Sequence, residues 1–116
     1  MNNKTILLVE DFHAKPYGRY RDDCTTCPET SGQTFREDML AVDLREYDQV
    51  TVDLTGYNRY GRSFLDEGFG ALIRKSGFIK AELDKKLIYK HDHLTSVITI
   101  IDERIREAEA DRLARL

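Results

Sequence analysis

The sequence lacks several features that would place it in a familiar class of protein. It has no excess of basic residues, because 18 lysines and arginines face 21 acidic residues and leave a net charge of −3. That charge gives no general attraction to nucleic acid or to an anionic membrane. No apolar run approaches the ~18 residues of a membrane span, and the N-terminal residues lack a signal-peptide layout. We therefore expect a cytoplasmic protein that binds neither nucleic acid nor a membrane.

Catalytic signatures are missing as well. The chain contains no nucleophile–base–acid set, no phosphate-cradling loop and no zinc-protease motif. It also lacks internal repeats, low-complexity tracts and an obvious linker. With 116 residues it is expected to form one domain, residues 1–116, that buries about two-thirds of its unfolded surface. These absences favour a non-enzymatic domain without a cofactor.

What the sequence does contain is a clear strand–loop–helix unit between Gln49 and Gly77. Apolar and polar residues alternate from Val50 to Leu54, which predicts a strand. A polar loop follows, and then an apolar face recurs at helical spacing in Leu65, Phe69, Leu72 and Ile73. Ser63 is predicted to cap this helix in a Ser-x-x-Asp capping box with Asp66, and Gly77 is predicted to end it.

Two glycines, Gly68 and Gly70, lie inside that predicted helix. Each costs roughly 1 kcal/mol relative to alanine, so a pair within one turn requires a reason. One interpretation is close packing of the helix against its own sheet. The other is close approach of a partner to the start of the helix, since loops between a strand and a helix often carry sites.

The remaining segments complete an α/β pattern. Strands are predicted at residues 5–12 and 86–90, while residues 19–21 form either an edge strand or an ordered loop. A helix capped by Thr30 with Gln33 is expected around Phe35 and Met39. Two more helices are expected at residues 79–85 and 93–112. The predicted fold is a small mixed sheet of about four strands with packed helices.

Two motifs give the chain a family resemblance, which extends from about Pro16 to Ala108. They are SGQTFRE at residues 31–37 and SFLDEGFG at residues 63–70. With them the chain resembles the STAS-like domain family of unknown function. The resemblance implies a relationship to STAS domains, the anti-sigma-factor antagonists of bacterial partner switching. Such a domain binds a kinase-like ATPase, and phosphorylation of a serine at the start of the helix releases that partner.

The resemblance also implies where a partner would dock. Aligning the Gly-aromatic-Gly motif places Asp66 and Glu67 where a STAS domain has its two serines. Glu67 would then supply a fixed negative charge, or Ser63 would be the phosphorylated residue instead. Changing Glu67 to serine is accordingly expected to alter partner affinity without unfolding the domain. The predicted partner-binding residues are Arg62, Ser63, Phe64, Asp66, Glu67, Gly68 and Phe69.

Arginines in or near the same segments are candidates for ordering the loop before the helix. Arg19, Arg36 and Arg62 are expected to pair with carboxylates there, since a guanidinium group suits bidentate contacts. The carboxylates in question are Asp53, Asp66 and Glu67. The alternative is that these are three unrelated surface arginines.

The two cysteines, Cys24 and Cys27, offer functions of another class. A C-x-x-C pair is half of a tetrahedral zinc site, to which His13, His91 or His93 would add ligands, but no second cysteine pair exists. A redox dithiol is another possibility, and two incidental reduced thiols in a cytosolic loop are the favoured interpretation. The segment at residues 91–93 is expected to end a strand and cap the last helix. A structural dimerisation module remains a third functional alternative.

Overall fold

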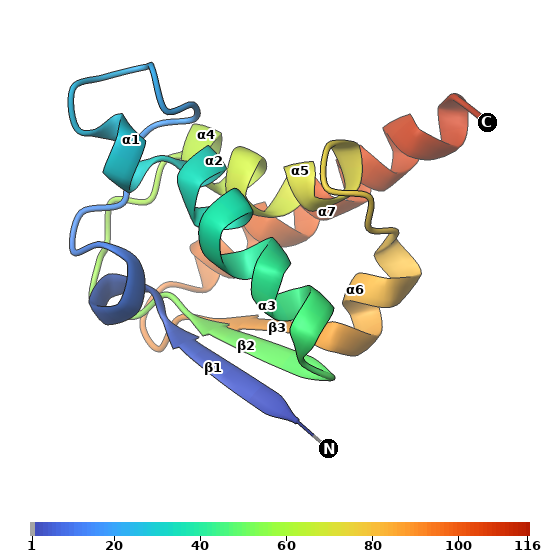
Figure 1. The fold of residues 1–116 in the computed structure, drawn as a ribbon, viewed down its shortest axis with the longest axis horizontal. Helices are drawn as coiled ribbons and strands as arrows, with labels where there is room; N and C mark the ends of the chain where they lie inside the picture. Colours follow the sequence, from blue (N-terminus) through green and yellow to red (C-terminus); the bar gives the residue numbers. More distant parts are fainter. Residues whose placement is uncertain (1) are drawn as a thin grey trace.

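A computed structural model describes residues 2–116 as two layers, a small sheet and a layer of helices packed on one of its faces (Figure 1). The sheet has three parallel strands in the order β1-β2-β3. The strands are β1 (Asn3–Leu7), β2 (Gln49–Asp53) and β3 (Leu87–Lys90). The expected mixed sheet of about four strands is therefore corrected for the described residues to a parallel sheet of three.

The missing strand is the segment at residues 19–21, which is a loop. Its backbone is bonded to a helix, because the carbonyl groups of Gly18 and Arg19 accept hydrogen bonds from Gly32 N and Gln33 N at 2.9 and 3.0 Å. A backbone satisfied in this way does not need a sheet edge.

Helices connect the strands, and two of them contain a π-helical turn. Residues 32–46 form one continuous helix made of α2 (Gly32–Phe35), η2 (Arg36–Leu40) and α3 (Ala41–Glu46). Residues 62–74 form another, made of α4 (Arg62–Leu65), η3 (Asp66–Gly70) and α5 (Ala71–Arg74). The other helical elements are η1 (Leu8–Phe12), α1 (Cys27–Thr30), α6 (Lys80–Lys86) and α7 (Thr95–Ala114).

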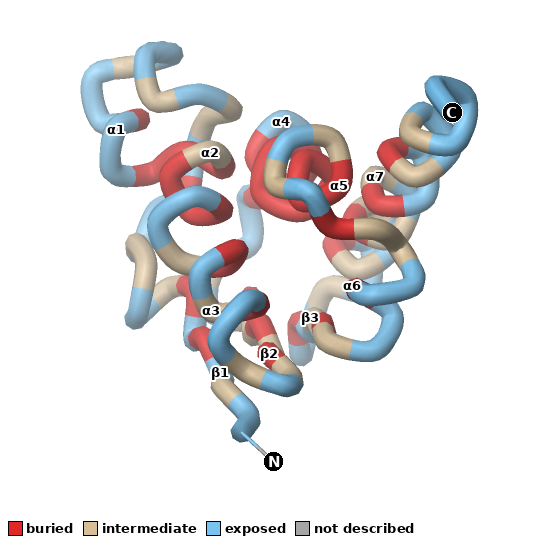
Figure 2. The backbone as a smooth tube through the Cα atoms, turned by 45° about the vertical axis from the view of Figure 1, so that its right-hand side comes forward, coloured by how far each residue is buried: buried red, intermediate tan, exposed pale blue. Residues whose placement is uncertain are grey.

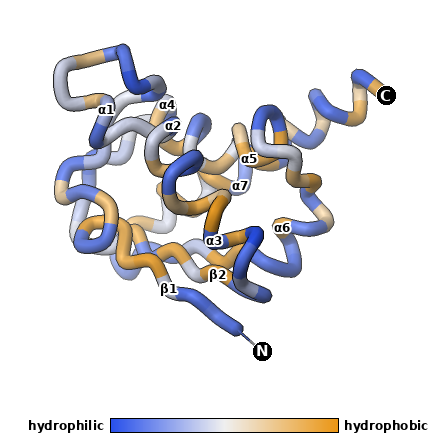
Figure 3. The backbone as a smooth tube through the Cα atoms, viewed as in Figure 1, coloured by the Kyte–Doolittle hydropathy of each residue, from blue (hydrophilic) through white to orange (hydrophobic). Residues whose placement is uncertain are grey.

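The core lies between the sheet and the helices, where Figure 2 shows the buried segments facing one another. In β2, Val50 and Val52 are fully buried, whereas Thr51 and the other residues of alternate position keep partial exposure. The apolar face predicted for the helix after β2 joins the same core as these valines and Ile101 of α7, as expected. Figure 3 shows the same division, with hydrophobic stretches along the strands and a hydrophilic start to β1.

Several predicted elements are confirmed. The helices expected at residues 79–85 and 93–112 correspond to α6 and α7, and the strand expected at residues 86–90 corresponds to β3. The helix after β2 ends at Arg74 with Lys75 as its C-cap, so Gly77, with a φ of +87°, lies in the loop beyond the cap rather than at the helix end itself. None of the helices in residues 2–116 combines the length and the apolar character needed to cross a membrane.

Two predictions near the N-terminus are wrong. The first strand ends at Leu7 rather than Phe12, because the chain turns into η1, which buries Leu8 and sets the Phe12 ring 5.2 Å from Phe35. The helix that begins at Gly32 is capped by Ser31, whose hydroxyl accepts from Thr34 N at 3.2 Å. Thr30, the predicted cap, instead donates its hydroxyl to the carbonyl of Tyr17.

Candidate functional site

The helix after β2 starts without a side-chain cap. Gly61 is the N-cap residue, with an extended backbone at φ −81° and ψ 154°, and no side chain bonds to the first free N–H groups. Ser63 is already the second residue of α4, and within residues 2–116 its hydroxyl makes no hydrogen bond. The predicted capping box is therefore wrong, because the Asp66 carboxylate is held by two arginines instead.

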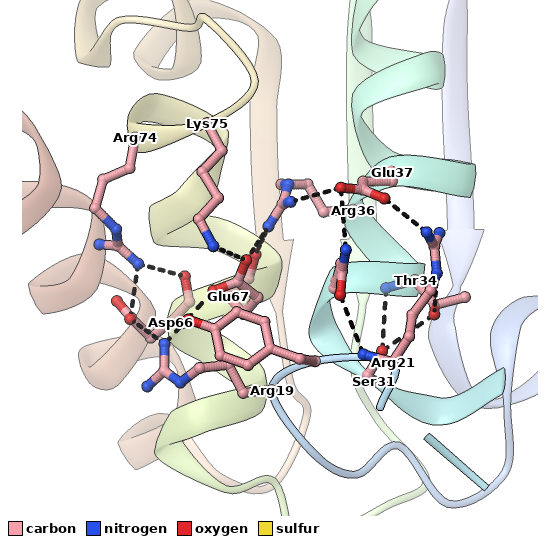
Figure 4. A network of polar contacts seen from close by, with 12 residues as sticks. Arg19, Arg21, Ser31, Thr34, Arg36, Glu37, Asp66, Glu67, Arg74 and Lys75 are labelled. Atoms are coloured by element: carbon pink, nitrogen blue, oxygen red, sulfur yellow. Dashed lines mark hydrogen bonds and ion pairs between the residues drawn. The ribbon is translucent and has the colours of Figure 1, made fainter. Parts of the chain in front are cut away.

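Asp66 and Glu67 lie at the centre of a cationic network (Figure 4). Oδ2 of Asp66 accepts hydrogen bonds from Arg19 Nη1 at 2.6 Å and from Arg74 Nη2 at 2.7 Å. Oε2 of Glu67 accepts from Arg36 Nη1 at 2.8 Å and from Lys75 Nζ at 2.9 Å. Two carboxylates are thus shared among four cations that come from the loop before α1 and from both long helices.

Arg36 is the most buried member of this network, with 1% of its side chain exposed. It is the first residue of η2, and its Nη1 donates both to the carboxylate and to the backbone carbonyl of Glu67 in η3. Nη2 reaches Oε2 of Glu37 at 3.2 Å, while Nε has no partner within residues 2–116. The π-helical turns of the two long helices are therefore joined through one guanidinium group.

The network determines the charge state of its carboxyl groups. Burial alone would raise the pKa of Asp66, but hydrogen bonds from Arg19 and Arg74 outweigh it and leave the pKa below its ordinary value. The same balance lowers the pKa of Glu67, where Lys75 and Arg36 outweigh burial. Both groups are carboxylates at neutral pH, so neither is poised to donate or accept a proton.

The glycines of this helix allow other helices to approach closely. A Cβ atom on Gly70 would lie 3.1 Å from the backbone oxygen of Arg104 in α7 and 2.8 Å from Asp66 Oδ1. Gly68 faces Gly32 of α2. A Cβ atom on Gly32 would lie 2.5 Å from the carbonyl oxygen of Phe64. The packing interpretation is thus supported, with neighbouring helices rather than the sheet as the packing partners.

Beside the network, the start of α4 borders a cavity of about 540 Å³. Its lining combines arginines, tyrosines and glycines from two loops, namely Tyr17, Gly18, Arg19, Tyr20, Asp23, Arg59, Gly61, Arg62, Ser63 and Phe64. Arg59 has no carboxylate within 4.0 Å in the described part of the chain, and Arg62 has only Glu103, at 3.9 Å. Arg19 connects cavity and network, because it lines the first and pairs with Asp66 in the second.

Comparison with known families agrees with the two motifs at residues 31–37 and 63–70. The model of the STAS-like domain of unknown function matches residues 31–96, more than half of the chain. The chain belongs to this family. Neither the curated proteins nor the solved structures gave a match.

Within this STAS-like domain, the predicted partner-binding surface is mostly interior. Five of its members are buried between neighbouring elements, namely Phe64, Asp66, Glu67, Gly68 and Phe69. Only Arg62 and Ser63 are exposed. A single apolar stripe on the predicted helix gave no sign that α2 and α7 would pack on its other sides. Of the predicted residues, only these two are therefore accessible at the surface.

The arginine predictions divide in the same way. Pairing with the helix carboxylates is confirmed for Arg19 and Arg36. Arg62 takes no part in the network, and Asp53 pairs with Lys90 of β3 at 3.7 Å instead. The sequence interpretation missed Tyr17, Tyr20 and Arg59, although Arg and Tyr recur in both loops that border the cavity, at residues 17–21 and 57–62.

The cysteines of the STAS-like domain form a disulfide between Cys24 and Cys27, so the expectation of two reduced thiols is corrected. Cys27 begins α1 and is fully buried, which brings its sulfur beside Gly18 of the cavity loop. No three His, Cys, Asp or Glu side chains among residues 2–116 are grouped closely enough to hold a metal ion. His91 follows β3, and its Nδ1 accepts from the backbone N–H groups of His93 and Leu94 in the turn before α7.

Proposed function

We propose that this STAS-like domain is a non-enzymatic signalling module that binds a protein partner, a kinase-like ATPase of the anti-sigma-factor type. In the STAS domains that the chain resembles, the partner docks at the start of the helix after a central strand. Here that place is the start of α4, directly after β2 and its loop. The docking surface that we propose consists of Tyr17, Tyr20, Arg59, Arg62 and Ser63.

The observation that carries this proposal is the exposure of arginines and tyrosines around one cavity at the start of α4. Tyr17 and Tyr20 are 62% and 39% exposed, and the side chain of Arg62 is 70% exposed. Arginine and tyrosine are enriched among the residues that dominate binding energy at protein interfaces. Phe64, which lines the same cavity, belongs to the buried core, so the start of α4 is anchored by packing.

The test is titration calorimetry of the domain against a purified kinase-like ATPase domain of the anti-sigma-factor type. The variant Arg59→Glu with Arg62→Glu should weaken binding by at least about tenfold, because both charges face the partner. The matched control, Lys85→Glu with Arg115→Glu, makes the same change of charge at exposed positions of α6 and the C-terminal end of α7. Equal affinity for the parent and the first variant would show that this surface does not dock the ATPase.

A further inference from the structure

We infer that the cavity between residues 17–23 and the start of α4 binds a phosphate monoester. The inference concerns a ligand group rather than a protein surface, so it goes beyond the proposed docking of an ATPase and can fail or succeed separately. Its basis is the placement of Arg19, Arg59 and Arg62 around one cavity.

The charge of this cavity runs against the charge of the whole chain. The sequence has 21 acidic and 18 basic residues, yet the lining holds three arginines and a single acidic residue, Asp23. That aspartate accepts the backbone N–H of Tyr20 at 2.9 Å and keeps its charge, so three arginines against one aspartate leave an excess of two positive charges. The cavity is therefore a local site of positive charge on an acidic domain, which attracts an anion.

Two of these guanidinium groups have donors to spare. Arg59 has no carboxylate within 4.0 Å in residues 2–116, and the contact between Arg62 and Glu103 is 3.9 Å long. A guanidinium group offers five N–H donors in a planar fork that matches the oxygens of a phosphate. Two arginines at one cavity suit a dianionic phosphate better than a singly charged carboxylate.

The third arginine is fixed in place. Arg19 Nη1 is bonded to Asp66, and the carbonyl of Arg19 accepts from Gln33 N at 3.0 Å. A donor already held in position loses little freedom when it binds a ligand, which favours affinity. The adjacent Tyr20 ring lies against cations on both Arg19 and Lys75, at 6.0 and 4.7 Å from its centroid.

The size and remaining chemistry of the cavity also fit a small ester. A volume of about 540 Å³ lies within the usual range of small-molecule sites. Within residues 2–116 the Ser63 hydroxyl at the cavity wall makes no hydrogen bond, and Tyr17 is 62% exposed. A phosphate on an aromatic group would therefore meet donors at one end and a tyrosine face at the other.

The experiment is a titration of the domain with small ligands at constant ionic strength, monitored by ¹⁵N–¹H NMR. The probes are phenyl phosphate, inorganic phosphate, benzoate, and a short peptide containing phosphotyrosine. Phenyl phosphate should shift the amide signals of Gly18, Gly61 and Ser63, and should bind more tightly than inorganic phosphate or benzoate. If the peptide binds more tightly than phenyl phosphate, the phosphate monoester belongs to a phosphorylated protein. If the peptide binds equally or more weakly, the ligand is a free small ester.

Variants separate a specific site from general attraction. Arg59→Gln with Arg62→Gln should weaken phenyl phosphate by about tenfold or more, since each lost bond to a charged group is costly. Lys85→Gln with Arg115→Gln removes the same two charges far from the cavity and should leave the affinity unchanged. The inference is overturned if phenyl phosphate produces no localised shifts, if benzoate binds as tightly, or if the control pair weakens binding equally.

Discussion

Two groups of arginines lie near the start of the helix after β2, and they differ in burial and in pairing. One group pairs with Asp66 and Glu67 and consists of Arg19, Arg36 and Arg74. The other lines the cavity and consists of Arg19, Arg59 and Arg62. Arg36 is 1% exposed and shares its donors among Glu67 and Glu37, whereas the side chain of Arg62 is 70% exposed and has only a distant carboxylate. Arg19, with 30% of its side chain exposed, belongs to both groups. The first group joins helices, and the second leaves donors available to a ligand or partner.

Burial and pairing, not residue type, therefore separate an arginine that stabilises the fold from one that is available to bind. A buried guanidinium group is tolerated only when carboxylates and carbonyls satisfy it, so its partners become indispensable. An exposed guanidinium group contributes little to stability because water replaces a missing partner. Substitutions should therefore affect the free energy of unfolding in one group and binding in the other.

The largest expected effect is on the buried group. Glu67→Ser should lower the free energy of unfolding by about 3–5 kcal/mol, because the buried Arg36 would lose its buried carboxylate partner and keep only the solvent-exposed Glu37. From the sequence alone, the same substitution is expected to change partner affinity without unfolding the domain; the burial of Glu67 predicts a loss of stability instead. Urea denaturation followed by circular dichroism measures the loss. A parent-like midpoint would mean that Arg36 does not depend on Glu67.

A paired substitution is the control for that experiment. Arg36→Met combined with Glu67→Leu removes both charges and keeps apolar volume, which is often neutral or stabilising for a buried ion pair. Lys75 loses its partner too, but its side chain is 45% exposed and can turn to solvent. If the double variant is as unstable as Glu67→Ser, the loss comes from packing rather than from an unpaired charge.

The second effect is a dependence of the same group on pH. The folded pKa values of Asp66 and Glu67 lie below the ordinary values of 3.8 and 4.5. On acidification the unfolded chain is therefore protonated first. The contribution of these two carboxylates to the free energy of unfolding should be fully present above the ordinary pKa values. It should decline as the pH falls from those values toward the folded pKa values. Urea midpoints between about pH 6 and pH 3 measure the decline. Asp66→Asn should reduce its slope, and an unchanged slope would assign the decline to other carboxylates, such as Asp53.

A smaller effect is expected where the two groups meet, at the loop that carries Arg19. Reducing the Cys24–Cys27 disulfide should lower stability by about 2 kcal/mol, the loop-entropy estimate for so short a ring. The comparison is urea denaturation with and without dithiothreitol, and Cys24→Ser with Cys27→Ser serves as the control that reductant cannot affect. A reductant effect of equal size in that control would show that the disulfide is not its cause.

The sequence predicted the helices and strands around these arginines better than it predicted their side-chain contacts. The central strand, the helix after it and the last helix follow from apolar periodicity, which records the core-facing residues. Periodicity does not record how many helices surround one helix, so the burial of Asp66 and Glu67 was missed. Charged residues at a predicted helix start suggest solvent, unless the chain also brings cations such as Arg36 to them from a distant helix.

The cavity was missed for a related reason. Its lining comes from residues 17–23 and 59–64, and only tertiary structure brings these two segments together. One local rule also failed, since Ser63 matches a capping box, but Gly61 takes the cap position and Asp66 turns to Arg19. The competing partner came from a loop 47 residues away in the chain, a separation that local pattern cannot include.

The smallest effect on stability is expected at Arg62. Its side chain is largely in water, and its contact with Glu103 is 3.9 Å long, so Arg62→Gln should change the free energy of unfolding by less than about 0.5 kcal/mol. Arg19→Gln should cost more, because Asp66 would then keep only Arg74. Urea denaturation at low and high salt tests both variants, since an exposed ion pair is screened and a partly buried one much less so. If Arg62→Gln destabilised the domain as much as Arg19→Gln, the two arginines would belong to one structural group. The proposed phosphate site would then keep Arg59 as its one arginine with free donors among the described residues.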